Sequence, residues 1–249
     1  MTHAPSSIQQ ISPPPIDGLR RSEQSRPSAL LADIILGGQD GLVNTLGVIL
    51  GVAAASNDPH LVLAAGLAAT FAESISMGAV AYTSTLAEHD HYRVELARER
   101  HEIRVMPCAE EQEVRSIFTD WGFTGDLLEQ AVAQVIKSEE AWVDVMMRNE
   151  LKMAPIESSN APRIALIVGV SAIIGSFIPL LPFLLLPIGA AMLTALVLSA
   201  LALFGLGAYK AHVTIGVPSR SGLQLAVIGI VSALAGYFIG ALFHAPVTP

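Results

Sequence analysis

The sequence of 249 residues has one cysteine and little charge. The single cysteine, Cys108, excludes a framework of internal disulfide bonds. Charged residues make up only 14% of the chain, whereas about a quarter of a soluble domain is charged. Together with a mean hydropathy of +0.53, this favours a membrane protein. The formal net charge of −8 argues against nucleic acid as a partner.

The N-terminal region lacks the apolar core of a signal peptide. Residues 1–30 are rich in Pro, Ser and Gln, which predicts a disordered tail. The absence of a targeting segment and the alanine-rich composition favour a bacterial inner membrane. A vacuolar membrane is the alternative if the protein is eukaryotic.

Five segments are long and apolar enough to cross a bilayer, which requires about 20 residues in a helix. They lie at about residues 31–55, 61–87, 161–184, 186–210 and 221–244. Because Pro179, Pro182 and Pro187 lie around the boundary of the third and fourth segments, these could instead form one broken span. The expected fold is an all-α membrane protein with five transmembrane helices, two in residues 31–87 and three in residues 161–244.

Glycines recur at a spacing that allows transmembrane helices to approach closely. The pairs are Gly37 and Gly41, Gly47 and Gly51, and Gly236 and Gly240. They indicate helix contacts, although glycine is also simply common in membrane helices.

The basic residues predict the orientation. All 14 Lys and Arg residues fall in the N-terminal tail, between Arg93 and Arg163, or in the connection that holds Lys210 and Arg220. With five spans, these three regions lie on one face of the membrane, and positive charge marks the cytosolic face. We therefore expect a cytosolic N-terminus and a cytosolic insert at residues 88–155.

Carboxylates occur inside the predicted spans, where they are costly and usually face a polar pathway. Asp40 lies among glycines in the first span, and Glu73 lies in the middle of the second. Met77 follows Glu73 by one helical turn on the same face. A carboxylate beside a thioether suits a transition metal better than Ca²⁺ or Mg²⁺. Asp33 lies nearer the end of the first span and is expected to be interfacial.

The insert holds most of the 22 acidic residues. No proline interrupts the second span before about residue 105, which predicts a single helix of about 65 Å that extends beyond the membrane. One face of its extension is acidic and the opposite face carries arginines. The acidic face comprises Glu88, His91, Glu95, Glu99 and Glu102. Because like charges at this spacing repel, the face requires a compensating cation.

Two more helices are expected after Pro107, at about residues 109–120 and 126–152. The first would bury Val114, Ile117, Phe118 and Trp121. A three-helix insert could bring together Glu99, Glu102, Glu110, Glu113 and Glu150 with a methionine, Met146 or Met147. Several close carboxylates cannot all remain ionised without metal or protons, which predicts divalent-cation binding that weakens at low pH. The alternative is an acidic, solvated domain with methionine in its core.

Four stretches resemble the vacuolar iron transporter family: "GGQDGLVNTLGVILGV", "AGLAATFAESISMGAVAYTS", "EHDHYRVELARERHEI" and "WVDVMMRNEL". The resemblance covers about residues 31–244, and its motifs are most specific in the first two spans and the insert. It implies a five-span homodimer that exports Fe²⁺, and often Mn²⁺, from the cytosol by proton antiport. It also implies a cytosolic domain that captures metal and a pore at the dimer interface. Zn²⁺ is a further candidate ion.

The resemblance assigns roles to individual residues. Asp40 matches the pore aspartate and Met77 the pore methionine. The residues that match the metal-binding domain are Glu99, Glu102, Glu110, Glu113, Glu150 and Met146. Characterised plant members carry a pore glutamate directly after "AGLA", where this chain has Ala69; Glu73, one turn on, is the candidate replacement.

We therefore expect a transporter without a prosthetic group rather than an enzyme. One alternative is a membrane-anchored ferroxidase, because Glu88 and His91 form one Glu-x-x-His unit. Di-iron carboxylate bundles use that unit twice, and a second copy is missing. The other alternative is a metal sensor, in which the insert binds metal while Asp40 and Glu73 are dispensable.

Overall fold

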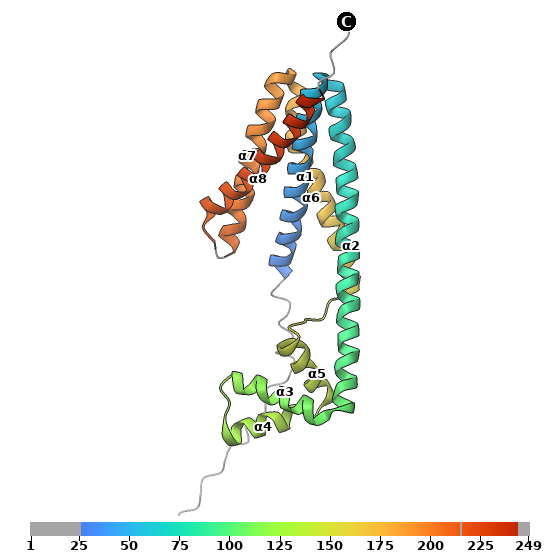
Figure 1. Ribbon diagram of the computed structural model, residues 1–249, viewed down its shortest axis with the longest axis vertical. Coiled ribbons are helices and arrows are strands. Elements are labelled where there is room, and N and C mark those ends of the chain that lie inside the picture. Colours follow the sequence, from blue (N-terminus) through green and yellow to red (C-terminus); the bar gives the residue numbers. More distant parts are fainter. Residues whose placement is uncertain (1–25, 215, 244–249) are drawn as a thin grey trace, which may run out of the picture.

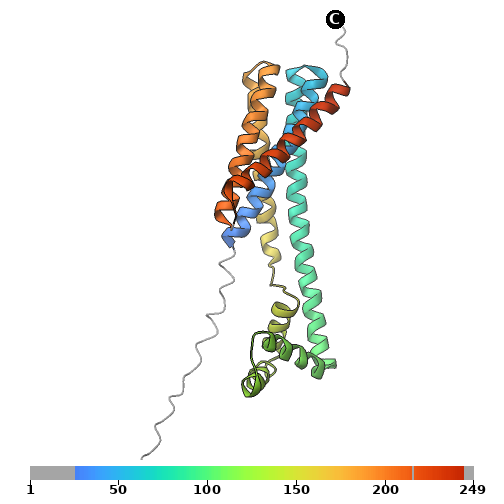
Figure 2. The same cartoon turned by 60° about the vertical axis from the view of Figure 1, so that its left-hand side comes forward.

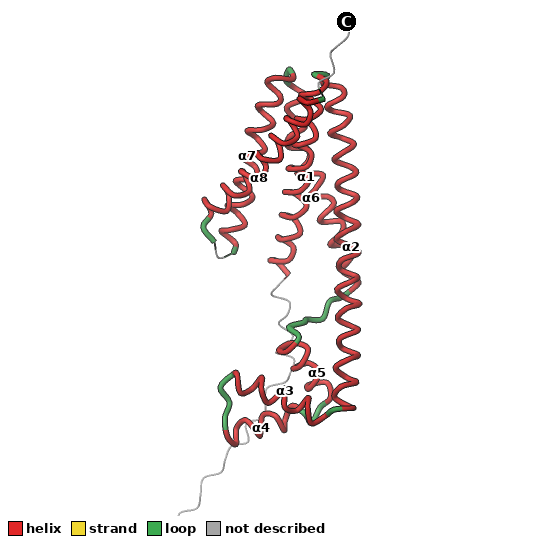
Figure 3. The backbone as a smooth tube through the Cα atoms, in the orientation of Figure 1, coloured by secondary structure: helices red, strands yellow, loops and turns green. Residues whose placement is uncertain are grey.

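The structure is a computed structural model that describes residues 26–214 and 216–243, with side chains described from Leu30 onward. No strand occurs in these two ranges, and helices make up nearly all of them (Figure 3). The helices are α1 (Arg26–Ser56), α2 (Pro59–Val105), α3 (Pro107–Asp120), α4 (Gly125–Val135), α5 (Glu139–Val145), the π-helical turn η3 (Met146–Glu150), the 3₁₀ turn η4 (Ser158–Asn160), α6 (Ala161–Leu185), α7 (Ile188–Val213) and α8 (Pro218–Leu242). The tail predicted at residues 1–30 lies, up to residue 25, outside the described residues, and α1 begins at Arg26.

Five of these helices are long and apolar enough to cross a membrane, namely α1, α2, α6, α7 and α8. This confirms the predicted number of spans. The third and fourth spans are separate helices, because α6 continues through Pro179 and Pro182 to Leu185. The chain turns at Leu186, whose backbone is extended, as a residue before proline prefers. Pro187, at the N-cap of α7, therefore marks the boundary.

The helices are arranged so that their connections alternate between two ends of the bundle. The α1–α2 and α6–α7 connections lie at one end, while the insert, the start of α1 and the start of α8 lie toward the other (Figures 1 and 2). In the part of the chain that the structure describes, the region between Arg93 and Arg163 and the connection that holds Lys210 and Arg220 thus lie toward the same end as the start of α1. Which side of the membrane that end faces remains a prediction.

Helix α2 is continuous over 47 residues, or about 70 Å at 1.5 Å per residue. Asp58 caps its first turn by accepting a hydrogen bond from the His60 backbone N–H at 2.8 Å. The helix ends at Val105, with Met106 as its C-cap, because Pro107 follows and begins α3. One half of α2 packs in the bundle and the other half extends beyond it to carry the insert (Figure 1), as the sequence predicts.

Helix α1 lies between α6 and α8 and contacts both through glycines. A Cβ atom built on Gly41 would lie 2.2 Å from the carbonyl oxygen of Ala172 on α6, and one on Gly240 would lie 1.9 Å from that of Gly51. Real Cβ atoms do not approach so closely, so these helix contacts require glycine. The predicted packing role of the glycine pairs is confirmed. The remaining side of α1 faces α2 and carries the polar residues described below.

The insert encloses an apolar core of its own against the end of α2. Its buried members are Ile103, Val114, Phe118, Val132, Trp142, Val143, Met146 and Met147. The predicted single helix at residues 126–152 is wrong: α4 ends at Val135 and α5 begins at Glu139. Ser138 starts the new helix by accepting a hydrogen bond from the backbone N–H of Ala141, a common function of serine at an N-cap.

The predicted burial of Trp121 is also wrong, since the residue is 56% exposed. Helix α3 ends one residue earlier, and the chain reverses at Gly122, whose φ of +90° favours glycine. Phe123 then packs on Phe118, with 5.6 Å between ring centroids, while Trp121 contacts the same ring from the outside at 5.3 Å. The buried tryptophan of the insert is Trp142.

Candidate metal centres

Five glutamates of the insert form what we call the acidic cluster: Glu99 and Glu102 on α2, Glu110 and Glu113 on α3, and Glu150 in η3. The sharp turn at Met106 and Pro107 brings the Glu-x-x-Glu pair of α2 beside that of α3. Electrostatic interactions within the cluster connect Glu150 with Glu113, Glu99 and Glu110. The structure therefore brings together all five predicted glutamates.

Two members of the acidic cluster are almost completely buried. Glu99 is 1% exposed and Glu110 is 4% exposed. In the described part of the chain, each has one carboxylate oxygen, Oε2, that is buried without a hydrogen-bond partner. A buried polar atom without a partner costs about 1–3 kcal/mol, and more when it is charged. Both oxygens are therefore available to a cation.

The clustering raises the pKa values of these carboxyl groups. Burial, followed by the charges of Glu113, Glu99 and Glu102, raises the pKa of Glu110 to about 7. Although the residue as a whole is exposed, partial desolvation of its carboxyl group and the charge of the neighbouring Glu113 raise the pKa of Glu150 to about 7. Burial and the charge of Glu102 also raise the pKa of Glu99. Near neutral pH, protons and metal ions therefore compete for the same oxygens.

The carboxylates of the acidic cluster lie near one another, but they do not surround a single metal position. Among the residues that the structure describes, no three His, Cys, Asp or Glu side chains are placed to surround a single metal position. Glu113 and Glu150 are exposed, and Glu102 is partly exposed, so these three side chains have room to rotate toward an ion. Cys108, in the first turn of α3, is also exposed.

The π-helical turn places methionine and glutamate differently from an α-helix. The N–H of Leu151 donates to the carbonyl of Met146, five residues earlier, at 3.2 Å, which is the π-helical pattern and is often found at functional sites. Met146 and Met147 are both fully buried in the core of the insert, whereas Glu150 reaches the acidic cluster. The structure thus places Met146 among apolar side chains.

Arg98 is a basic residue in contact with the acidic face of α2. Its guanidinium group lies 3.0 Å from Glu95, 3.8 Å from Glu99 and 3.6 Å from Glu102. The sequence reasoning placed arginines only on the opposite face and missed this one. The spacing was a usable signal, because Arg98 follows Glu95 by three residues and precedes Glu102 by four.

A second polar site lies where α1 and α2 meet inside the predicted membrane region. The amide of Asn44 on α1 donates a hydrogen bond to Oε2 of Glu73 on α2. The carboxyl group of Asp40, one turn before Asn44, interacts directly with that of Glu73. Met77 is partly buried one turn further along α2. The structure therefore joins Asp40 and Glu73, which are far apart in the sequence, and adds Asn44, for which the sequence had suggested no role.

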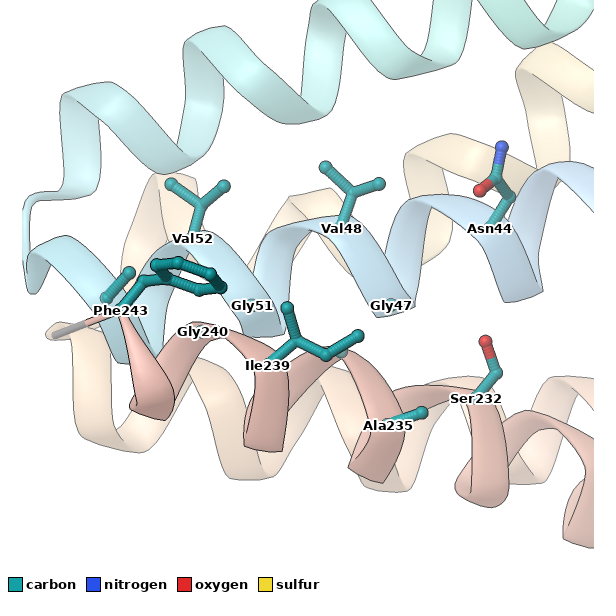
Figure 4. Close-up of a pocket in the computed structure, with 12 residues that line it drawn as sticks. Asn44, Gly47, Val48, Gly51, Val52, Ser232, Ala235, Ile239, Gly240 and Phe243 are labelled. Carbon is teal, nitrogen blue, oxygen red and sulfur yellow. The ribbon is translucent and has the colours of Figure 1, made fainter.

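A groove of about 560 Å³ runs between α1 and α8. It begins at Asn44, passes the glycines Gly47 and Gly51, and ends at Phe243 near the end of α8 (Figure 4). Its lining is mainly apolar, and the side chain of Asn44 points away from α8 (Figure 4). The groove thus runs along the bundle from the height of the polar site to the end that is distant from the insert.

The comparisons with known proteins all indicate the same family. The family model described as "VIT family" matches residues 31–241. Vacuolar iron transporter 1 of Arabidopsis thaliana is 34% identical over 209 residues, which cover 84% of each chain. Vacuolar iron transporter 1 of Oryza sativa is 34% identical over 84% of this chain and 83% of its own. A vacuolar iron transporter of Plasmodium falciparum is 24% identical over 84% and 81%.

Proposed function

The chain belongs to the VIT family, and on that premise we propose that it is a membrane transporter that exports Fe²⁺, and also Mn²⁺, from the cytosol. The relatives that cover most of its length are named vacuolar iron transporters. Its five apolar helices provide the membrane part. The insert, on the cytosolic side by the distribution of basic residues, is the part that captures the ion.

The observation that carries this proposal is the pair of buried, unpartnered oxygens on Glu99 and Glu110. Burying carboxylates without partners opposes folding, and a divalent cation would remove that cost by binding both. Oxygen ligands alone suit many divalent ions, including Fe²⁺, Mn²⁺ and Zn²⁺. Met146, which the family resemblance also assigns to this site, would have to turn out of the apolar core to contribute its sulfur.

The ion would then pass to Asp40, Glu73 and Met77 in the membrane region. Two carboxylates that interact with each other inside a membrane are costly, and a transported cation relieves their repulsion. Glu73 supplies the carboxylate that the family pattern places at the position of Ala69. Its direct interaction with Asp40 supports that substitution.

A homodimer fits the surface of the membrane region. Asn44 is exposed in the single chain, and a polar side chain facing lipid is unfavourable. The groove beside it is open along α1 and α8. A second copy that covers the exposed side of α1 would remove Asn44 from lipid and place two polar sites around one pathway.

Proton antiport provides the means of release. Protons that reach Asp40 and Glu73 from the side opposite the insert would neutralise these carboxylates and lower their affinity for the ion. A proton gradient directed into the cytosol then drives metal out. The same carboxylates thus serve both ions in turn.

Flux into proteoliposomes tests the proposal. Fe²⁺ under anaerobic conditions, or Mn²⁺, should accumulate only when a pH gradient of the correct direction is present. Asp40→Ala should abolish this accumulation, and normal flux in that variant would contradict the proposed pathway. Oxygen consumption after Fe²⁺ addition, measured in parallel, should stay at background; consumption above background would instead support a ferroxidase.

A further inference from the structure

Arg98 lies within the acidic surface that is proposed to receive the metal. Its three guanidinium nitrogens face three different carboxylates: Nη1 lies 3.0 Å from Glu95, Nη2 3.8 Å from Glu99 and Nε 3.6 Å from Glu102. Two of these, Glu99 and Glu102, are members of the acidic cluster. The arginine is thus the counter-ion that the protein itself supplies to the site.

We propose that Arg98 is a displaceable internal counter-ion, which holds Glu99 and Glu102 in the metal-free protein and must withdraw when a divalent cation binds. This inference rests on the proposed metal capture by the acidic cluster. An arginine remains charged at every accessible pH, so its guanidinium group and the metal compete for the same oxygens. Arg98 therefore sets the concentration of metal at which the insert fills.

The geometry allows such a withdrawal. The side chain of Arg98 is 50% exposed, and its shortest contact is to Glu95, one turn closer to the membrane and outside the proposed ligand set. The contacts to Glu99 and Glu102 are longer, at 3.8 and 3.6 Å. Arg98 can therefore leave the ligands while it keeps Glu95 as its partner.

The same arrangement predicts how a substitution that removes the charge of Arg98 changes the affinity for metal. Arg98→Gln leaves Glu99 and Glu102 without their internal partner, so the metal no longer displaces a positive charge. We expect the affinity for Mn²⁺ to increase by about tenfold, which corresponds to the loss of one or two partly exposed ion pairs. A structural role alone predicts the opposite, because a disordered ligand set binds more weakly.

The experiment uses the full-length chain in detergent and measures Mn²⁺ binding by equilibrium titration. Arg98→Gln is compared with Arg100→Gln, which removes the same charge two residues further along α2, where the side chain is exposed. Arg98→Lys keeps the charge but cannot reach three carboxylates at once, and an intermediate affinity is expected. A mutant cycle, in which Arg98→Gln is combined with the double variant Glu99→Gln/Glu110→Gln, tests whether the effect of Arg98 on Mn²⁺ affinity depends on the acidic cluster.

The outcomes separate the two proposals. A tighter Mn²⁺ affinity in Arg98→Gln than in Arg100→Gln, which disappears in the Glu99→Gln/Glu110→Gln background, supports the inference. Equal affinities in Arg98→Gln and Arg100→Gln, or weaker binding in Arg98→Gln alone, overturn it while metal capture stands. Unchanged Mn²⁺ binding in Glu99→Gln/Glu110→Gln itself would overturn metal capture by the acidic cluster, and this inference with it.

Discussion

Asn44 on α1 donates its side-chain amide hydrogen bond to the carboxylate of Glu73 on α2. The two residues are 29 positions apart, and the contact joins the first two spans at the polar site that contains Asp40. A side-chain hydrogen bond of this kind fixes the orientation of the carboxyl group that accepts it. The pair therefore holds Glu73 in position opposite Asp40.

The first prediction concerns the polar site between α1 and α2. Glu73→Gln should retain the hydrogen-bonding contact to Asn44 in part but lose the charge that attracts the ion. Because charge in the pathway is required for cation passage, we expect Mn²⁺ flux in proteoliposomes to fall by at least about tenfold, with metal binding by the insert unchanged. Asp33→Asn, on the same helix as Asp40 but nearer its end, is the matched control and should transport normally. Comparable losses in both variants would contradict a specific role for Glu73.

The second prediction concerns the buried oxygens of the acidic cluster. The double substitution Glu99→Gln/Glu110→Gln replaces two buried carboxylates, each with one oxygen that has no hydrogen-bond partner, by neutral amides, so the free energy of unfolding of the metal-free insert should rise by roughly 1–3 kcal/mol. The same change should weaken Mn²⁺ binding by about tenfold or more. Both tryptophans, Trp121 and Trp142, lie in the insert, so intrinsic fluorescence reports its unfolding.

The control for this variant is Glu139→Gln, at the start of α5. Glu139 pairs with Arg104 at 2.8 Å and lies outside the acidic cluster. Exposed pairs contribute about 0–1 kcal/mol, so this variant should bind Mn²⁺ as the wild type does. Loss of metal-free stability in Glu99→Gln/Glu110→Gln would show that the buried carboxylates are satisfied after all.

The third prediction is a pH dependence of stability and binding. The pKa values of Glu110 and Glu150 are raised from 4.5 to about 7 in the folded protein. Between these values the folded state binds more protons than the unfolded state, so the stabilisation is complete below about 4.5 and is lost as the pH rises through about 7. The unfolding temperature of the metal-free protein should therefore fall by several degrees between about pH 5 and pH 8.

Metal should reverse that trend. Mn²⁺ competes with protons for these carboxylates, so its affinity should increase over the same pH range and its stabilising effect should be largest at the alkaline end. Thermal unfolding followed by tryptophan fluorescence, with and without Mn²⁺, measures both. A metal-free unfolding temperature that rises with pH would contradict the assigned direction of the pKa shifts.

The fourth prediction concerns the contact between α1 and α8. Gly240→Ala places a Cβ atom 1.9 Å from the carbonyl oxygen of Gly51, so the two helices must separate. Overpacking of this kind typically costs about 1–3 kcal/mol, and the unfolding temperature in detergent should fall. Gly205→Ala, on α7, meets no atom within 4 Å and should not lower the unfolding temperature. Equal stability of both variants would show that α8 does not pack tightly on α1.

The sequence by itself determined the number and order of the membrane helices and the length of α2, because the signals for these features are local. The length of apolar runs predicted five spans, and the absence of proline from residue 61 to about residue 105 predicted the long α2. The Glu-x-x-Glu pairs predicted which side chains would gather, since their spacing places them on one helical face. The sequence also predicted, through the glycine pairs, which positions allow close helix packing.

Only the tertiary structure decided which partners meet across elements and which side chains the core excludes. The pairing of Asn44 with Glu73 depends on how α1 and α2 cross, which no local pattern specifies. The burial of Met146 and the exposure of Trp121 depend on the π-helical turn and on the reversal at Gly122. Burial depends on which side chains fit into the limited apolar core, and charge clusters depend on which distant segments meet. The spacing of residues along a single helix specifies neither.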